Sequence, residues 1–380
     1  MRFEQVIGHR DLGAKLRAGA QSGRVAHAQL FNGPEGSGAL ALALAYARYL
    51  HCSAPTEADA CGQCSSCVQY DTLQHPDLHW SFPFFRKDGS DHALSQPFQA
   101  AWRERVLQGP YFGQEEWLAA IGADRKQLFI SVQEAMELNR KLGLKAFAGG
   151  WKVLILWLPE AMRVDTANKM LKLIEEPPEN TLLIFVAQKE ELLLGTIVSR
   201  CQLVRVPRLK DEEIAQALQQ LKSLPPEKAH LLAHLADGDL NDALKLSQNQ
   251  EYSFSDLFIS WLRHCYTGNE VELTAMTEKI CQFGREEQKQ FLQYGLHFLR
   301  EMTQIKLTGE ASNARLLEAE KKPAQSLAGL LSVEQLDKMS RLLNDCAYYI
   351  ERNANQKLLF LDASIQVHKL FKMNRQPVNG

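Results

Sequence analysis

The fold is decided by the stretch Gln29-Leu-Phe-Asn-Gly33-Pro-Glu-Gly36-Ser-Gly38-Ala39-Leu40. Its first three residues resemble the end of a buried strand, and the run from Ala39 to Leu50 is rich in alanine and leucine, which favour helix. Three glycines lie between them. A strand, a glycine loop and a helix in this order form the frame that holds phosphate groups at a helix N-terminus.

The side chains that a working phosphate loop adds to this frame are missing. In the pattern G-x4-G-K-[ST] the lysine contacts the terminal phosphates and the hydroxyl holds magnesium. Here these two positions are Ala39 and Leu40, and Glu35 adds a negative charge near the place of the phosphates. We therefore predict a degenerate loop, formed by Gly33, Gly36, Gly38, Ala39 and Leu40, that lacks the groups needed for ATP hydrolysis; whether ADP stays bound in it is left open by the sequence.

The next buried strand fails a second test for phosphoryl transfer. An active site needs acidic residues at its end to hold magnesium and orient the attacking water. The strand expected at 152–157 instead continues as Trp157-Leu158-Pro159, and Glu160 follows only after the proline. Both failures together predict that this chain does not hydrolyse ATP.

Residues 1–207 alternate helical and strand patterns, which indicates an α/β domain with a mostly parallel sheet. The runs at 152–157 and 181–187 are continuously apolar, as expected for strands that are buried on both faces. Between them, the segment from Thr166 to Glu176 has a helical composition and is ended by Pro177-Pro178.

The segment at about 78–125 is predicted to be an insertion, because its aromatic residues stand among proline, glycine and polar residues. The basic residues Arg86, Lys87, Arg103 and Arg105 are interleaved with Trp80, Phe82, Phe84, Phe85, Trp102, Tyr111, Phe112 and Trp117. Such a surface can stack single-stranded nucleic acid. Packing of the aromatic residues onto the host domain is the favoured interpretation, and we assign the segment no function.

After Pro207 the strand signals fade. Residues 208–250 are expected to form a small helical unit, with Ile214, Leu218 and Leu221 at helical spacing. Residues 251–380 are expected to form an all-helical domain that ends in one long helix over 333–372 and buries apolar surface against sister subunits.

A group of cysteines predicts a structural zinc site. Cys52, Cys61, Cys64 and Cys67 fall within one short segment, and the cysteines at 201, 265, 281 and 346 are scattered. Four thiolates can hold one tetrahedral zinc ion, which then stiffens a loop and has no open position for catalysis. His51 in place of Cys52, a redox pair and unligated cysteines are the weaker alternatives.

Composition excludes several classes of protein. The chain has 380 residues, a formal charge of −2, 45% apolar and 23% charged residues, which is typical of a globular protein. The apolar runs are too short to cross a membrane, and the first ten residues fit neither a secretory signal nor a transit peptide. We therefore expect a cytoplasmic protein without a membrane partner.

Several motifs together resemble one family. Arg24-Val-Ala-His-Ala-Gln-Leu-Phe31, the cysteine group, His75-Pro-Asp77, Asn168-Lys-Met-Leu-Lys-Leu-Ile-Glu-Glu-Pro-Pro178 and Ser199-Arg-Cys201 stand in the order found in AAA+ subunits of bacterial clamp loaders. The resemblance covers most of residues 1–207, and 352–358 is more weakly similar to the collar helix of that family. It implies an AAA+ domain with a P-loop-type frame and a zinc module at 52–67, a helical lid at 208–250 and a collar at 251–380.

Within this family, further losses point to a type of subunit that does not hydrolyse ATP, and not to the hydrolysing gamma/tau type. Asn241 stands where the second sensor motif normally has arginine. Ala187 and Gln188 stand where the first sensor usually has a hydroxyl or an amide, and Gln188 leaves this position ambiguous.

The resemblance implies that Arg200, flanked by Ser199 and Cys201, reaches into the ATP site of a neighbouring subunit. A guanidinium is always charged and can stabilise transition-state charge there as an arginine finger. The implied partners are gamma/tau and delta subunits, the sliding clamp and primer-template DNA.

Other interpretations remain open. The chain is alternatively an active ATPase with an unusual loop, or a zinc-containing nucleic-acid-binding protein that works alone, which its near-neutral charge disfavours. Arg140, Lys141 and Lys145 in the helical segment 131–145 are candidates for DNA phosphate contacts. A solvated basic helix face is the favoured account of these three residues.

Overall fold

The computed structural model describes residues 1–86, 94–123, 126–248, 254–309, 311, 314, 316 and 318–373, with the side chain of Glu286 left out. Lys87 of the predicted aromatic and basic surface, the end of the insertion at 124–125 and the boundary of the predicted helical domains at 249–253 lie outside these residues.

The chain forms two compact units. The first contains 1–221 and 236–244, and the second contains 222–235 and 245–380. The predicted helical segment 208–250 therefore contributes to both units. The boundaries predicted at 207 and 250 stay predictions.

The first unit is built around a parallel sheet with the strand order β2-β3-β4-β1-β5. The strands are β1 (Ala28–Asn32), β2 (Leu78–Ser81), β3 (Lys152–Trp157), β4 (Thr181–Ala187) and β5 (Gln202–Arg205). Every residue of β3 and β4 is buried, as their continuously apolar sequences predict. The predicted parallel α/β sheet is confirmed.

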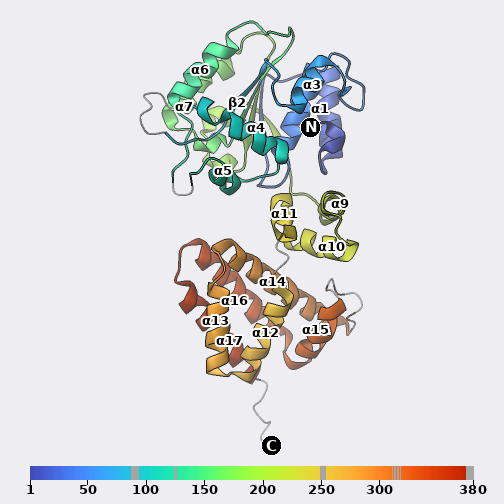
Figure 1. Ribbon diagram of the computed structural model, residues 1–380, viewed down its shortest axis with the longest axis vertical. Coiled ribbons are helices and arrows are strands. Elements are labelled where there is room, and N and C mark those ends of the chain that lie inside the picture. Colours follow the sequence, from blue (N-terminus) through green and yellow to red (C-terminus); the bar gives the residue numbers. More distant parts are fainter. Residues whose placement is uncertain are drawn as a thin grey trace, which may run out of the picture. The chain divides into compact units, whose positions relative to one another are not determined.

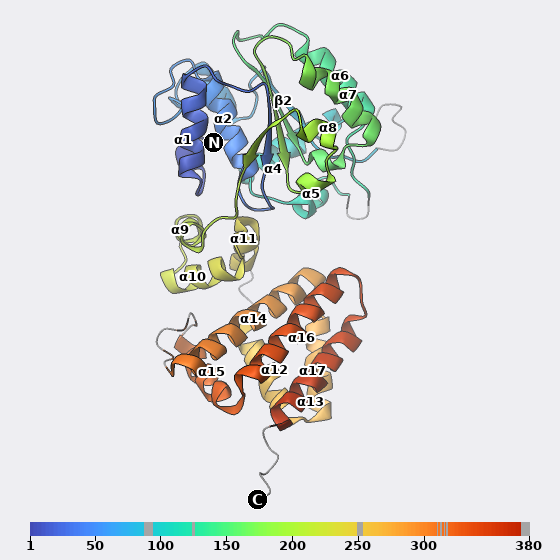
Figure 2. The same cartoon turned by 180° about the vertical axis from the view of Figure 1, so that it is seen from behind.

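Helices cover both faces of this sheet. The helices of residues 1–222 are α1 (Arg10–Gln21), α2 (Ala39–His51), α3 (Ser65–Asp71), α4 (Gln99–Gln108), α5 (Gln114–Ala120), α6 (Val132–Leu142), α7 (Val164–Glu175), α8 (Gly195–Val198) and α9 (Asp211–Lys222), with 3-10 turns η1 (Phe3–Gln5), η2 (Gln96–Phe98), η3 (Pro159–Ala161) and η4 (Glu190–Leu192). Figures 1 and 2 show α1 and α2 on one side of the strands and α6 and α7 on the other. Leu138, Met170 and Ile174 pack with strand residues into one buried cluster.

The segment predicted as an insertion begins inside the sheet. Its first residues form β2, which pairs with β3 and places Trp80 opposite Ile155. The part that leaves the sheet therefore starts after Ser81. Its aromatic side chains pack inward, since Phe82, Trp102 and Trp117 are fully buried. This confirms the packing interpretation and leaves these rings unavailable for stacking on nucleic acid.

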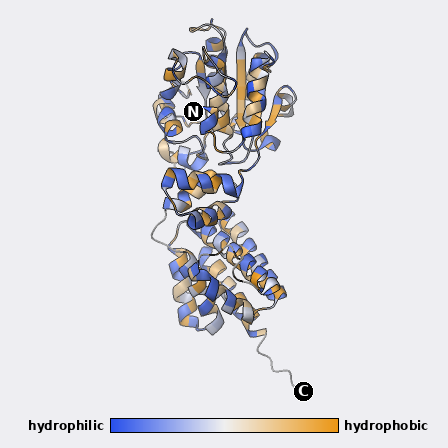
Figure 3. Ribbon diagram, turned by 90° about the vertical axis from the view of Figure 1, so that its right-hand side faces the viewer, coloured by the Kyte–Doolittle hydropathy of each residue, from blue (hydrophilic) through white to orange (hydrophobic). Residues whose placement is uncertain are grey.

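The helices after β5 complete the two units. The helices α10 (Pro226–Leu235) and α11 (Leu240–Gln248) are followed by α12 (Phe254–Thr267), α13 (Glu270–Cys281), α14 (Arg285–Thr308), α15 (Glu318–Leu330), α16 (Val333–Glu351) and α17 (Gln356–Met373). In Figure 3 apolar and polar residues alternate along these helices, as expected when each helix buries one face.

The prediction of one long helix over 333–372 is wrong. The helix α16 ends at Glu351, and Asn353 takes the left-handed conformation with φ 64°. The side chain of Asn355 then accepts a hydrogen bond from the N–H of Leu358 and caps α17. Asparagine tolerates left-handed backbone and caps helices well, so this short segment both ends one helix and begins the next.

Candidate functional site

The glycine loop has the backbone frame that the sequence predicts. It connects β1 to α2, and Gly36 and Gly38 have φ values of 68° and 91°, where a glycine is favoured. Gly38 is the N-cap of α2. The frame of a phosphate loop is therefore present at the carboxyl end of β1.

The space over this loop is filled by the protein itself. The Tyr111 ring lies so close that a Cβ at Gly38 would be 2.9 Å from it. The Tyr111 hydroxyl accepts a hydrogen bond from the N–H of Ile7 at 2.9 Å. Burial raises the pKa of Tyr111 to about 12, so the hydroxyl stays neutral. We call this segment, residues 109–113, the loop cover.

Glu35 closes the loop from a second direction. Its carboxylate occupies the place that a Cβ at Gly113 would take, and it accepts a hydrogen bond from the Asn241 amide at 3.3 Å. The N–H of Leu240 donates to the Gly36 carbonyl. Residues 36–40 of the loop are buried in this arrangement.

The two positions that should carry lysine and a hydroxyl belong to the core. Ala39 and Leu40 are 6% and 4% exposed and begin α2. A magnesium ion and a nucleotide would need polar groups here. Neither Ala39 nor Leu40 offers a charge or a magnesium ligand.

The carboxyl end of β3 is likewise apolar. Trp157 packs against Trp102 and Phe112, with ring centroids 5.2 and 5.1 Å apart. Glu160 instead stabilises the turn after β4, because its Oε1 accepts hydrogen bonds from the N–H groups of Gln188 and Lys189 at 2.5 and 2.6 Å. Burial raises the pKa of Glu160. At the first sensor position, Ala187 is fully buried.

Arg200 lies on the surface just before β5. Its Nε donates to the Glu175 carboxylate at 2.7 Å, and its Nη1 donates to the Thr196 carbonyl at 3.1 Å. The Arg200 and Glu175 side chains are 40% and 48% exposed. Arg200 therefore forms an ion pair with Glu175 of its own chain, as a surface arginine without a catalytic role also does.

The two neighbours of Arg200 differ in burial, and only Cys201 contacts the core. Ser199 is exposed and donates its hydroxyl to the Thr196 carbonyl. Cys201 packs against the buried cluster beneath the sheet, and burial raises its pKa to about 12. Cys201 is therefore a neutral anchor.

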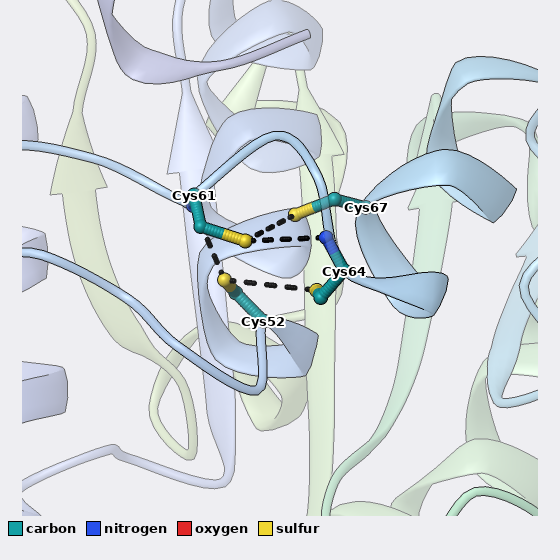
Figure 4. Close-up of side chains that lie close together, drawn as sticks. All are labelled: Cys52, Cys61, Cys64 and Cys67. Carbon is teal, nitrogen blue, oxygen red and sulfur yellow. Dashed lines mark hydrogen bonds between the residues drawn. The ribbon is translucent and has the colours of Figure 1, made fainter.

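The four clustered cysteines converge as predicted. Figure 4 shows their sulfur atoms pointing toward one another, from the end of α2, the following loop and the start of α3. All four lie within 4.8 Å of one another, with Sγ–Sγ distances of 3.9 Å for Cys52 and Cys64 and 4.0 Å for Cys61 and Cys67. Zn–S bonds of about 2.3 Å in a tetrahedron separate the sulfurs by about 3.8 Å, so this group can hold a metal ion.

The surroundings of the cysteines shift their pKa values in both directions, and burial raises the pKa of Cys52 to about 12. Hydrogen bonds from the N–H groups of Gln63 and Cys64 lower the pKa of Cys61. Burial raises the pKa of Cys67, and the buried Arg48 guanidinium opposes this shift. Backbone N–H groups and a guanidinium are the partners that a tetrathiolate metal site needs.

His51 is not available as a fourth ligand. Its Nδ1 pairs with the Tyr70 hydroxyl at 2.6 Å, and its Nε2 pairs with the Trp151 carbonyl at 2.8 Å. The alternative that replaces Cys52 by His51 is therefore wrong in this structure.

The basic residues of α6 are largely paired on their own helix. Arg140 and Lys141 approach Glu137 at 2.8 and 3.6 Å, whereas Lys145 follows the helix and is exposed. This arrangement supports the interpretation that these three residues form a solvated basic helix face and do not contact DNA phosphates.

Two residues of the site were not found from the sequence. Tyr111 is part of an aromatic segment, and no motif around it predicts that its ring will lie over the glycine loop. Glu175 belongs to the motif 168–178, but its partner Arg200 lies 25 positions away. The pairing of remote segments could be found only from the fold.

Residues 8–210, more than half of the chain, match the family described as "DNA polymerase III, delta subunit". The chain belongs to this family. The segment matched contains the glycine loop, the cysteine group and Arg200. It ends close to the boundary predicted for the α/β domain.

Curated relatives bear similar names. The chain is 28% identical over 232 residues to "DNA polymerase III subunit delta'" of Bacillus subtilis, covering 61% of this chain and 57% of the relative. It is 31% identical over 211 residues to the protein of the same name from Pseudomonas aeruginosa, covering 55% and 51%. The chain thus spans about half the length of these relatives. The delta-prime type, which the degenerate loop favours, agrees with these names.

The similarity extends to a subunit of another type. The chain is 26% identical over 250 residues to "DNA polymerase III subunit tau" of Escherichia coli, covering 64% of this chain and 32% of the relative. The solved "DNA clamp loader delta protein" of Bacillus subtilis aligns with 94% of this chain and 99% of its own, at 12% identity and a TM-score of 0.29, which is too low to establish a common fold.

Among the described residues, no helix is long and apolar enough to span a membrane.

Proposed function

We propose that this chain is a clamp-loader subunit that does not hydrolyse ATP and that donates Arg200 in trans to the ATP site of a neighbouring gamma/tau subunit. As a rigid stator it helps load the beta sliding clamp onto primer-template DNA. Family membership supports the clamp-loader role. The observation that carries the proposal is the exposed guanidinium of Arg200 in a chain whose own phosphate loop lacks the lysine and the hydroxyl and is covered by its own side chains.

At the neighbouring site, Arg200 acts on charge that develops during hydrolysis. The oxygen of a water molecule bonds to the γ-phosphorus while the bond to the β–γ bridging oxygen breaks, which gives ADP, inorganic phosphate and a proton. Negative charge on the γ-phosphoryl oxygens and the bridging oxygen is stabilised by the guanidinium, which remains charged throughout. Arginine fingers contribute about 10³- to 10⁵-fold to the rate of such sites.

The lack of hydrolysis in this chain itself is supported by the filled loop. Tyr111 lies against Gly38 and Asp239 lies against Gly36, and Ala39 and Leu40 bring no charge or magnesium ligand. We further propose that Cys52, Cys61, Cys64 and Cys67 hold a structural zinc ion and that 208–250 and 251–380 serve as lid and collar. Assembly with gamma/tau and delta subunits takes place through the collar, in the cytoplasm.

Reconstitution with gamma/tau and delta subunits tests the finger. Arg200→Ala should assemble normally and reduce ATP hydrolysis stimulated by the clamp and primed DNA, by about 10³-fold or more at the site that it serves. The total rate of ATP hydrolysis by the loader should then fall by the fraction that this one site contributes. Arg205→Ala is the matched control, because Arg205 is a nearby arginine that is 74% exposed. An unchanged ATPase in Arg200→Ala would remove the finger assignment.

The two rival functions have direct tests. An active ATPase would bind fluorescent ATP with magnesium and release phosphate as the isolated chain. A nucleic-acid-binding protein that works alone would bind DNA with a steep dependence on salt concentration. Neither is favoured by a specific observation, since the loop is closed and the aromatic residues Phe82, Trp102 and Trp117 are buried.

A further inference from the structure

Arg200 is held in one orientation by acceptors from two elements. The Glu175 carboxylate at the end of α7 accepts from Nε at 2.7 Å. The Thr196 carbonyl in α8 accepts from Nη1 at 3.1 Å. The guanidinium plane is therefore fixed at two points, although the side chain lies at the surface.

The two contacts leave one edge of the guanidinium available. A guanidinium has five N–H donors. One donor on Nε and one on Nη1 are in use, and the other three, which include both on Nη2, have no partner among the residues that the structure describes. The edge formed by Nη1 and Nη2 matches the spacing of two phosphate oxygens. Arg200 can therefore keep its contact with Glu175 while this edge binds a phosphate group.

Both acceptors stand on elements that are rooted in the core. Leu173 and Ile174 of α7 and Ile197 of α8 are buried in the cluster under the sheet. The backbone that carries Glu175 is therefore held in place, and its carboxylate can define where the guanidinium points.

We propose that Glu175 is a positioning residue for Arg200: it accepts from Nε and turns the free Nη edge toward a phosphate group of the neighbouring subunit's nucleotide. The proposal rests on the proposed function. Glu175 touches neither the nucleotide nor the reacting atoms. Its effect passes through Arg200 alone, so it should disappear when Arg200 is removed.

The reconstituted loader tests this dependence through a double-mutant cycle. Glu175→Gln should lower the kcat of stimulated ATP hydrolysis at the affected site about 2- to 5-fold, the range expected for an exposed ion pair. The KM for ATP should not change. In the Arg200→Ala background the same substitution should have no further effect, since a mutation that acts through an absent residue is not additive. Glu176→Gln, one position further along and exposed, is the matched control.

A measurement on the isolated chain reports the contact directly. The Nε–H resonance of Arg200 in ¹⁵N NMR spectra, assigned by its loss in Arg200→Ala, should exchange slowly with water in the wild type. The exchange should be faster in Glu175→Gln and unchanged in Glu176→Gln. Thermal unfolding of each variant checks that the fold persists.

The possible outcomes separate the two proposals. An unchanged ATPase in Arg200→Ala overturns the finger and the positioning role with it. If Arg200→Ala is impaired but Glu175→Gln hydrolyses ATP at the wild-type rate or faster, only the positioning role fails. The positioning role also fails if the effects of the two substitutions on the rate multiply in the double variant. It fails as well if the Nε–H exchange rate is the same in the wild type and in Glu175→Gln.

Discussion

Tyr111 shows how one side chain can fill the place of a ligand. It comes from a segment far from the glycine loop in sequence, lies against Gly38 and accepts a hydrogen bond from Ile7. The losses at Ala39 and Leu40 could be predicted from the sequence, because a motif fixes which residue types belong there. The replacement by Tyr111 could not, because nothing local to residue 111 states which remote surface it will meet.

The hydroxyl of Tyr111 should contribute to stability. Tyr111→Phe keeps the ring on Gly38 but leaves the partly buried N–H of Ile7 without its acceptor. We expect a loss of about 0.5–1.5 kcal/mol in the free energy of unfolding. Urea titration measures it, and Tyr349→Phe, at a position that is 49% exposed, serves as the control. Equal losses in the two variants would contradict this account.

At the level of elements, the turn after β3 should make stability depend on pH. Burial raises the pKa of Glu160 in the folded state above its ordinary value of 4.5. The folded protein therefore binds this proton more tightly than the unfolded chain does. The stability from this group is present below the unfolded pKa and is lost as the pH rises through the folded pKa.

Glu160→Gln should remove this dependence. Its amide oxygen can still accept from the N–H groups of Gln188 and Lys189, and the side chain carries no charge. Unfolding measured from pH 4 to 7 should show that the variant gains stability relative to the wild type as the pH increases. A difference that stays constant over this range would refute the role of Glu160.

The cysteine group between the end of α2 and the start of α3 should stabilise the fold through the zinc ion that we propose it holds. Strong chelators, or Cys64→Ser, should lower the free energy of unfolding by about 2–5 kcal/mol, as the loss of a crosslink does. Metal analysis of the purified protein should find about one zinc per chain. Cys281→Ser, at a scattered cysteine, should leave the zinc content unchanged. A wild-type protein that is free of metal and equally stable would contradict the zinc proposal.

The elements themselves were partly predictable. The runs of β3 and β4 are apolar along their whole length, so their burial follows from composition. The strand β2 is short and lies at the sheet edge, and its sequence resembles the segment after it. The break between α16 and α17 depends on the conformation of Asn353, which helical periodicity does not reveal.

On the scale of the whole molecule, the chain passes between the two units more than once. Residues 236–244 return to the first unit and supply the contacts of Leu240 with Gly36 and of Asn241 with Glu35. A fragment 1–248 should therefore unfold at a higher temperature than a fragment 1–221. Circular dichroism on heating measures the difference. Asn241→Ala should lower the unfolding temperature of the longer fragment part of the way to that of the shorter one. Equal midpoints for both fragments would contradict the prediction.

The loop cover also bears on how such a protein can change over generations. A lysine in place of Ala39 would put a charge in the core, and Tyr111 would still lie against Gly38. Trimming Tyr111 first would weaken the fold without any gain. A working phosphate loop would therefore require at least two coordinated substitutions, one that brings a cation to position 39 and one that removes the ring at position 111.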